Sequence, residues 1–355
     1  MKISRRKFLV FAVTAVALSV AGVLMVLLTA DLILHRRAER SAGLNRYGYR
    51  GPVAGRKRPG ELRIVMLGGS TVFGYGVAWN ESIPAFLEAA LQARISRPAS
   101  VVNLGYNNEG AYSFVPNLED FAYLDYDAIV LYEGYNDLPG DEGVNRSVYR
   151  RSSAVYRMTG YFPILPLYLE EKARSLRYGN IGAGYDALQP NGNRTPVVFR
   201  PGLAQRTSAA ALEAISSMTL ALDGQLAPTA AAAPPVARDS ALGCAFPYVT
   251  YCDSVAAAVR FGREHHKGVV VVSQPHLPGA RSDELHAKQR EMLGAMIARV
   301  FANDGRVLWA DLSELVDLKS VEVTFDGMHL KPAANATVAA ALVDPVMKVA
   351  AGADQ

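Results

Sequence analysis

The chain has 355 residues, half of them hydrophobic and a fifth charged, so it can bury a sizeable core and is not a disordered protein. Its net charge of +4 is concentrated at the N-terminus, where the first fifty residues hold nine lysines and arginines against Asp31 and Glu39, a net +7 that leaves the remainder at −3. A slightly acidic body lacks the basic footprint of a nucleic-acid-binding protein, and we expect no nucleic-acid partner.

The N-terminal segment predicts a membrane helix. Residues 8–30 carry no charge over 23 positions, which as a helix crosses a hydrocarbon core of roughly 30 Å. This run is longer than the apolar part of a signal peptide, about 7–15 residues, and no small-residue cleavage site follows it. We predict a signal-anchor helix over residues 1–34, with a cleaved signal as the alternative. The preceding stretch SRRKFLV resembles a twin-arginine export signal, or is an ordinary cationic start.

Residues 35–60 are basic and Gly-rich, which favours a juxtamembrane linker before a folded domain at 61–355. In that domain, apolar strands alternate with helical stretches, which indicates a three-layer α/β/α doubly wound parallel sheet. The predicted strands cover residues 62–67, 100–105, 127–134, 268–274 and 306–312. The predicted helices cover residues 82–95, 116–121, 252–265, 283–301 and 333–350.

Two segments do not fit this alternation. Residues 139–201 are rich in Tyr, Arg, Gly and Pro, with a possible helix over 165–176, and indicate an insertion whose aromatic and basic side chains either contact sugars or anionic headgroups or pack as a lid. Residues 224–240 form an Ala/Pro-rich low-complexity loop. The two cysteines, Cys244 and Cys252, are too few for a zinc site and form either one disulfide in an oxidising compartment or two buried thiols.

The end of the first predicted strand carries the stretch GGSTVFGYGV. It lacks the lysine of a phosphate-binding loop and the G-x-G-x-x-G spacing of a dinucleotide site. What remains is Ser70 in a turn opened by Gly68 and Gly69. Alone, such a turn is more often structural than catalytic.

The other strand ends supply the partners that a nucleophilic serine needs. Ligands of parallel α/β sheets bind beyond the carboxyl ends of the strands, where this chain places Gly105, Asn136, Asp326 and His329. His329 can take the proton of Ser70 and Asp326 can orient the imidazole. The N–H of Gly105 and the carboxamide of Asn136 can bind a developing oxyanion. His276, beyond the fourth strand, either lines the pocket or is solvated.

In these four blocks the sequence resembles the SGNH hydrolases, or GDSL esterase/lipase family, with Ser70 in GGST, Gly105 in NLG, Asn136 in GYND and His329 in DGMHL. The resemblance covers about residue 62 to the C-terminal helix. It implies that Ser70 is the nucleophile, His329 the base and Asp326 its orienter. The implied oxyanion hole consists of the N–H groups of Ser70 and Gly105 with Asn136, and no metal or organic cofactor is required. The family usually has aspartate where this chain has Gly69, so we expect a looser turn without loss of activity.

The expected function is that of a serine esterase that hydrolyses O-acyl, above all O-acetyl, esters of an envelope or exported polysaccharide. The expected location is the bacterial inner membrane, with a single membrane pass and the catalytic domain in the periplasm. Three alternatives stay open: an O-acyltransferase with the same triad, a lipid or lysophospholipid esterase, and a non-catalytic polysaccharide-binding protein. The oligomeric state is not predicted.

Overall fold

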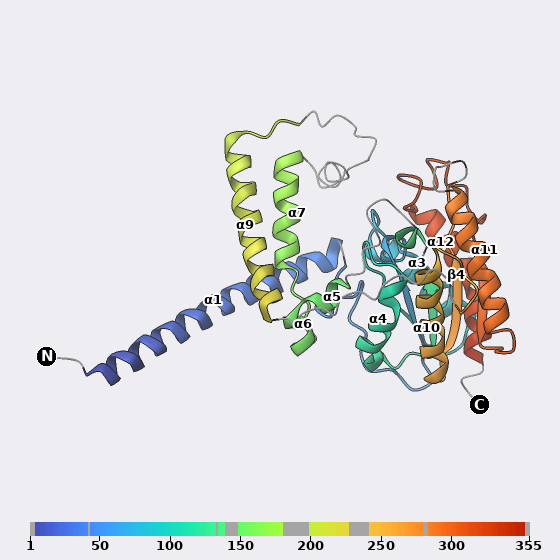
Figure 1. Ribbon diagram of the computed structural model, residues 1–355, viewed down its shortest axis with the longest axis horizontal. Coiled ribbons are helices and arrows are strands. Elements are labelled where there is room, and N and C mark those ends of the chain that lie inside the picture. The colour runs from blue at the N-terminus through green and yellow to red at the C-terminus, as the bar shows by residue number, and fades with distance from the viewer. Residues whose placement is uncertain are drawn as a thin grey trace. The chain divides into compact units, whose positions relative to one another are not determined.

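The computed structural model describes residues 4–41, 43–132, 134–138, 148–179, 199–226, 241–277, 279 and 283–351. The chain forms two compact units, one of Met1–Arg40 with Ser152–Ala230 and one of Ser41–Arg151 with Ala231–Gln355. Figure 1 shows the helices and strands of both.

The second unit contains a parallel sheet of five strands in the order β2-β1-β3-β4-β5. Every residue of the three central strands is buried, as expected for a sheet covered on both faces. The predicted α/β fold with a doubly wound parallel sheet is therefore confirmed. The strands are β1 (Leu62–Gly68), β2 (Ala99–Asn103), β3 (Ala128–Tyr132), β4 (Gly268–Ser273) and β5 (Val307–Asp311).

Helices cover both faces of this sheet. Helices α3 and α12 share one apolar core with Met66, Val130 and Val270. Because strand side chains alternate between faces, the neighbouring residues Ile129 and Val269 point the other way, and there they meet α10 at Gly262. The α-helices of this unit are α2 (Ser70–Phe73), α3 (Ile83–Arg94), α4 (Phe114–Asp120), α10 (Val249–Glu264), α11 (Asp283–Val300) and α12 (Pro332–Ala350), with 3₁₀ turns at Trp79–Glu81, Ala111–Ser113, Ala122–Leu124 and Tyr135–Asp137.

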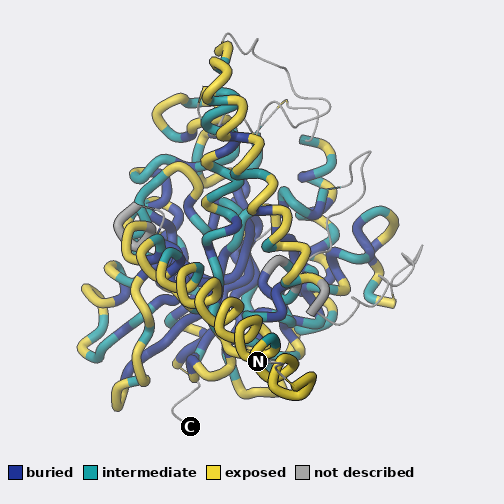
Figure 2. The backbone as a smooth tube through the Cα atoms, turned by 90° about the vertical axis from the view of Figure 1, so that its left-hand side faces the viewer, coloured by how far each residue is buried: buried dark blue, intermediate teal, exposed yellow. Residues whose placement is uncertain are grey.

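The first unit combines the N-terminal helix with helices from the predicted insertion. The side chains of the apolar part of α1 are exposed along its length, and this helix is long and apolar enough to cross a membrane (Figure 2). The C-terminal helix α12 passes the same test of length and composition, but half of its most apolar window is buried in the second unit. The helices are α1 (Arg5–Ser41), α6 (Ala154–Thr159), α7 (Leu165–Tyr178) and α9 (Leu203–Leu226), and α5 (Tyr149–Ser152) lies at the unit boundary.

Three predicted boundaries need correction. Helix α1 continues to Ser41, because Arg, Ala and Glu after residue 34 favour a helix, and the rest of the predicted linker 35–60 begins with a packed segment in which Leu44 and Tyr49 are buried. Residues 152–230, including α9, group with α1 in one compact unit. The predicted loop 224–240 begins inside α9, and its residues 227–240, like insertion residues 139–147 and 180–198, lie outside the described part of the chain.

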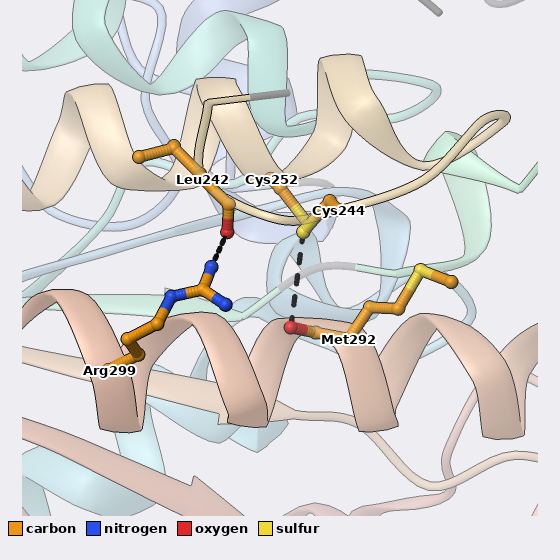
Figure 3. The surroundings of a disulfide bond; sticks show 5 residues. All are labelled: Leu242, Cys244, Cys252, Met292 and Arg299. Carbon is orange, nitrogen blue, oxygen red and sulfur yellow. Dashed lines mark hydrogen bonds between the residues drawn. A yellow bond between two sulfur atoms is a disulfide. The ribbon is translucent and has the colours of Figure 1, made fainter. Parts of the chain in front are cut away.

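Cys244 and Cys252 form a disulfide, with their Cα atoms 6.4 Å apart (Figure 3). The bond ties the loop before α10 to the first turns of that helix. The Cys244 sulfur lies 3.9 Å from the carbonyl oxygen of Met292, and Arg299 of the same helix, α11, donates to the carbonyl of Leu242. Of the two sequence alternatives, the paired form is the one that the structure contains.

Candidate active site

Ser70 lies directly after β1, at the first residue of the short helix α2. The chain turns sharply here because Gly68 has no side chain: a Cβ at this position would lie 2.1 Å from the carbonyl oxygen of Tyr132. The N–H groups of Gly74 and Tyr75 both donate to the Ser70 carbonyl at 2.9 Å and close the turn, with Gly74 at a positive φ of 84°. The turn thus holds Ser70 at the carboxyl end of the sheet, half-buried.

The structure brings Ser70, His329 and Asp326 together in one hydrogen-bonded chain. The Ser70 Oγ lies 2.8 Å from His329 Nε2. On the other side of the imidazole, Nδ1 lies 2.6 Å from Asp326 Oδ2. If the Asp326 carboxylate accepts from N–H at Nδ1, then Nε2 is the unprotonated nitrogen and faces the hydroxyl of Ser70.

The turn that carries Asp326 and His329 is fixed by hydrogen bonds from its backbone N–H groups to its own side chains. The Thr324 Oγ1 accepts from the N–H groups of Asp326 (3.2 Å) and Gly327 (2.6 Å), and Gly327 has a φ of +84°. Asp326 Oδ1 in turn accepts the His329 N–H at 2.8 Å. Burial raises the pKa of Asp326, but the hydrogen bonds from the side chain and backbone of His329 outweigh it, and the net pKa is below the usual value.

Two buried residues, Arg50 and Asn103, hydrogen-bond to backbone carbonyls of the Ser70 turn. The sequence predicted neither role. Arg50 donates to the carbonyls of Phe73, the last residue of α2, and of Gly74 (2.6 Å) and Val77 (2.5 Å) in the loop that follows. Asn103, the last residue of β2, donates its Nδ2 to the Val72 carbonyl at 2.9 Å. Arg50 also reaches β2 directly, because its backbone N–H donates to the Asn103 carbonyl at 3.1 Å.

Gly105 lies against the same turn, where no larger residue fits. A Cβ at Gly105 would be 2.6 Å from the Phe73 nitrogen and less than 3 Å from the Val72 side chain. Its N–H donates to Asn103 Oδ1 at 3.0 Å. This predicted oxyanion donor is therefore engaged within the protein.

Asn136 lies in the 3₁₀ turn after β3 and is held by the segment around Glu109. Its Nδ2 donates to the Glu109 carbonyl at 2.9 Å. Next to it, the Asp137 carboxylate accepts the N–H of Ala111 at 2.8 Å, and complete burial raises the pKa of Asp137 to about 7. Glu109 is itself paired with the buried Arg150 at 3.4 Å. The sequence placed Arg150 in a possible lid, whereas its guanidinium anchors this segment from inside.

His276 lies on the loop after β4, and its Nε2 is 2.9 Å from Asp283 Oδ1. Two contacts connect this loop with the triad: Gln274 accepts from the hydroxyl of Thr71, next to Ser70, and Leu277 lies against Gly327. The neighbouring His286 is buried, and burial together with the charge of His276 lowers its pKa to about 4. His276 is thus paired with Asp283, and the loop that carries His276 contacts Thr71 and Gly327, which are close to the triad in sequence.

A cavity of about 670 Å³ runs along β2 and α3 and is lined by residues such as Arg56, Trp79 and Glu88. Arg50 and Asn103, which hold the Ser70 turn, also line it, but no member of the triad does. Among the described residues, no cluster of three or more His, Cys, Asp and Glu side chains could hold a metal ion.

No family model and no curated protein matches the chain, but solved structures do. A member of the lipolytic protein G-D-S-L family from Veillonella parvula is 12% identical, with 80% of this chain and 97% of that chain covered and a TM-score of 0.40. A catalytic mutant of an acetylxylan esterase from Geobacillus stearothermophilus is 12% identical, with 80% and 94% covered and a TM-score of 0.42.

A third structure is a carbohydrate esterase family 2 enzyme with a carbohydrate binding domain from Corynascus thermopiles (Myceliophthora fergusii). It is 12% identical to this chain, with 86% of this chain and 70% of that chain covered and a TM-score of 0.43. Structures described as members of the lipolytic G-D-S-L family are thus among those that match this chain, each at 12% identity.

Proposed function

We propose that the protein is a serine esterase of the SGNH type, with Ser70 as nucleophile, His329 as general base and acid, and Asp326 as the orienter of His329. The observation that carries this proposal is the hydrogen-bonded chain from Ser70 Oγ through both ring nitrogens of His329 to Asp326. A serine with a purely structural role has no need of a base held by a carboxylate.

The reaction has two steps. Ser70 Oγ attacks the ester carbonyl while His329 Nε2 accepts the hydroxyl proton, and the imidazolium is stabilised by the Asp326 carboxylate. The tetrahedral intermediate collapses, the alcohol leaves with the proton from His329, and the acyl group stays on Ser70. A water molecule then attacks the acyl-enzyme, with His329 again taking a proton, and the carboxylic acid and free Ser70 are released.

The oxyanion would be held by the N–H groups of Ser70 and Gly105 and by the Asn136 carboxamide. A carboxamide nitrogen carries two N–H bonds, so Asn136 can keep its bond to Glu109 and donate a second one to substrate. The single N–H of Gly105 now donates to Asn103, and it must be shared or exchanged when an oxyanion forms. Loss of one oxyanion donor typically costs about 10²–10³ in turnover.

The substrate that the site supports best is an O-acylated carbohydrate. Two aromatic side chains flank the triad: the Tyr75 ring lies 4.7 Å from the His329 imidazole, and Phe325 is next to Asp326 in sequence. Both are partly exposed, with 36% of Tyr75 and 52% of Phe325 accessible to solvent. Exposed aromatic faces offer flat apolar surface to sugar rings, and short O-acetyl groups place little demand on an acyl pocket.

The proposed location of the protein rests on helix α1 and on the disulfide. At the end of α1, Asp31 accepts the N–H groups of Ile164 and Leu165, and His35 Nε2 lies 2.9 Å from the Phe162 carbonyl oxygen. Both residues follow the uncharged run, so cleavage before residue 31 would leave these contacts intact. We infer that α1 is retained as a single-pass anchor because its uncharged run of 23 residues is longer than the apolar part of a signal peptide, about 7–15 residues. The disulfide fits an oxidising compartment, and this supports our proposal that the catalytic unit lies in the periplasm of a bacterium.

The test is hydrolysis of p-nitrophenyl acetate, butyrate and octanoate, and of acetylated xylo-oligosaccharides, by the full chain and by Ser70→Ala. The proposal expects acetyl-preferring activity that is lost in Ser70→Ala. A preference for octanoate would favour a lipid esterase, and acetyl transfer to an added oligosaccharide would favour an acyltransferase. Activity that survives Ser70→Ala would contradict the mechanism.

A further inference from the structure

After the exposed Arg206 in its first turn, helix α9 has an outward face without charge. Between Thr207 and Leu222, none of its exposed residues is Asp, Glu, Lys or Arg. Three large apolar side chains stand out on this face, with exposed fractions of 47% for Ile215, 67% for Met218 and 62% for Leu222. The outward face of α9 consists of Thr207, Ser208, Ala210, Ala211, Ala214, Ile215, Ser217, Met218, Leu220, Ala221 and Leu222.

This face is not the one that packs within the unit. The opposite side of α9 lies on α7, where Ala209 is buried, Ser216 Oγ donates to the Pro166 carbonyl at 2.9 Å, and Arg177 pairs with Glu213 at 2.6 Å. A helix on the surface of a soluble domain carries charged and polar side chains on its solvent side. The composition of the outward face of α9 is therefore typical of a contact surface and not of a solvent-exposed helix face.

The hairpin of α7 and α9 is connected to the end of α1 at two places. Asp31, just after the last residue of the uncharged run of α1, holds the start of α7 through the Ile164 and Leu165 N–H groups. At the same open end of the hairpin, Asp223 near the end of α9 accepts the Val155 N–H of α6 at 3.1 Å. Helix α6 packs its Tyr156 against Phe162, whose carbonyl oxygen contacts His35 of α1. Figure 1 shows the two helices of the hairpin leaving from this end of α1.

We propose that the outward face of α9 lies on the bilayer that α1 crosses, on the side where α1 emerges, with Ile215, Met218 and Leu222 at the boundary of headgroups and acyl chains. The inference rests on α1 as a retained anchor, as proposed above. The exposed apolar surface of α1 ends near Asp31, where the hairpin begins. The surface of a bilayer crossed by this part of α1 therefore lies next to the outward face of α9. Amphipathic helices bind membranes in this manner, parallel to the surface.

The contact is apolar rather than electrostatic. Between Thr207 and Leu222 the one charged residue is Glu213, whose side chain is paired with Arg177 of α7. Membrane contact through this face is therefore expected to be insensitive to salt and to the fraction of anionic lipid, in contrast to a polybasic surface.

The test measures the membrane depth of a fluorophore. The full chain is reconstituted into phosphatidylcholine vesicles, and single cysteines at Met218, at Leu18 of α1 and at Val321 of the second unit are labelled with an environment-sensitive dye; the native cysteines are paired and do not react. Val321 is the matched control, because it is an apolar residue that is 75% exposed. Nitroxide-labelled lipids should quench the dye in Met218→Cys and in Leu18→Cys, but not in Val321→Cys.

A second variant tests the face itself. Ile215→Asp with Leu222→Asp should reduce quenching at Met218→Cys while esterase activity is unchanged. If Leu18→Cys is quenched and Met218→Cys behaves like Val321→Cys, the inference fails and the anchor survives. Cross-linking of Met218→Cys between two copies without quenching would identify a second copy as the occupant, and an unquenched Leu18→Cys would overturn the anchor and the inference together. Hydrolysis of p-nitrophenyl acetate by the same samples reports on the proposed function separately.

Discussion

The substitution Arg50→Met is expected to destabilise the catalytic unit and to lower its turnover. Methionine has a similar length but no donor, so the carbonyls of Phe73, Gly74 and Val77 lose their guanidinium partner. Arg50 is 4% exposed, so little water can replace it. The Phe73 carbonyl keeps the Asn103 Nδ2 as donor at 3.3 Å, and the Gly74 carbonyl keeps the Val77 N–H at 3.2 Å. We therefore count one acceptor, the Val77 carbonyl, as left without a partner, at a cost of about 1–3 kcal/mol.

Tryptophan fluorescence during urea unfolding measures this cost in the second unit alone, since both tryptophans, Trp79 and Trp309, belong to it. The matched control is Arg58→Met, because the Arg58 side chain is 62% exposed and its ion pair with Glu61 is 3.3 Å long. Glu61 is buried but keeps Arg63 and Ser100 as partners, so loss of the exposed Arg58 guanidinium should cost about 0–1 kcal/mol. Turnover of p-nitrophenyl acetate by Arg50→Met should fall below that of Arg58→Met under conditions where both are folded, because the Ser70 turn is the structure that loses its support. Equal unfolding midpoints for the two variants would refute this account of Arg50.

Three further outcomes are expected. Asp326→Asn should lower kcat for p-nitrophenyl acetate by roughly 10⁴ with little change in KM, since the imidazole loses its orienting carboxylate, and a fall below tenfold would argue against this role. Because burial raises the pKa of Asp137 to about 7 in the folded protein from 3.8, the folded state binds more protons than the unfolded state between these values, and stability falls as pH rises through that window. Urea midpoints at pH 5 and pH 8 should show that Asp137→Asn removes this loss; an identical pH dependence in both proteins would contradict it. Replacing Cys244 and Cys252 by serine should cost about 2–3 kcal/mol for a loop with a sequence separation of 8, and reductant should reproduce the effect in the wild type but not in the variant.

The sheet and the triad could be predicted because each leaves a local signal. The central strands of the sheet are buried on both faces and appear in the sequence as apolar runs, and Ser70 and Gly105 come within two residues of the ends of β1 and β2. Asp326 and His329 are three residues apart on one turn, so their hydrogen bond is a local feature that the sequence spacing indicates. Ser70 and His329 are 259 positions apart in the sequence. Their contact could be predicted only from the order of the four motifs along the predicted sheet.

The residues that support the site could not be predicted, because their roles depend on long-range contacts. Arg50 stands among basic, Gly-rich residues that look like a linker, and only its approach to the carbonyls after Ser70 gives it a function. Arg150 looks like a surface residue of an insertion and is in fact fully buried beside Glu109. Helix α9 was missed because its Ala- and Ser-rich sequence lacks the charged face of an ordinary surface helix, which is the same property that marks it as a membrane contact.

The most direct test of the central claim is covalent labelling by a fluorophosphonate, which reacts with serines activated by a neighbouring base. Intact-protein mass spectrometry should show one adduct, peptide mapping should place it on Ser70, and both Ser70→Ala and His329→Ala should remain unlabelled while they retain the wild-type tryptophan emission. An adduct on another serine, or equal labelling of His329→Ala, would contradict the proposed triad.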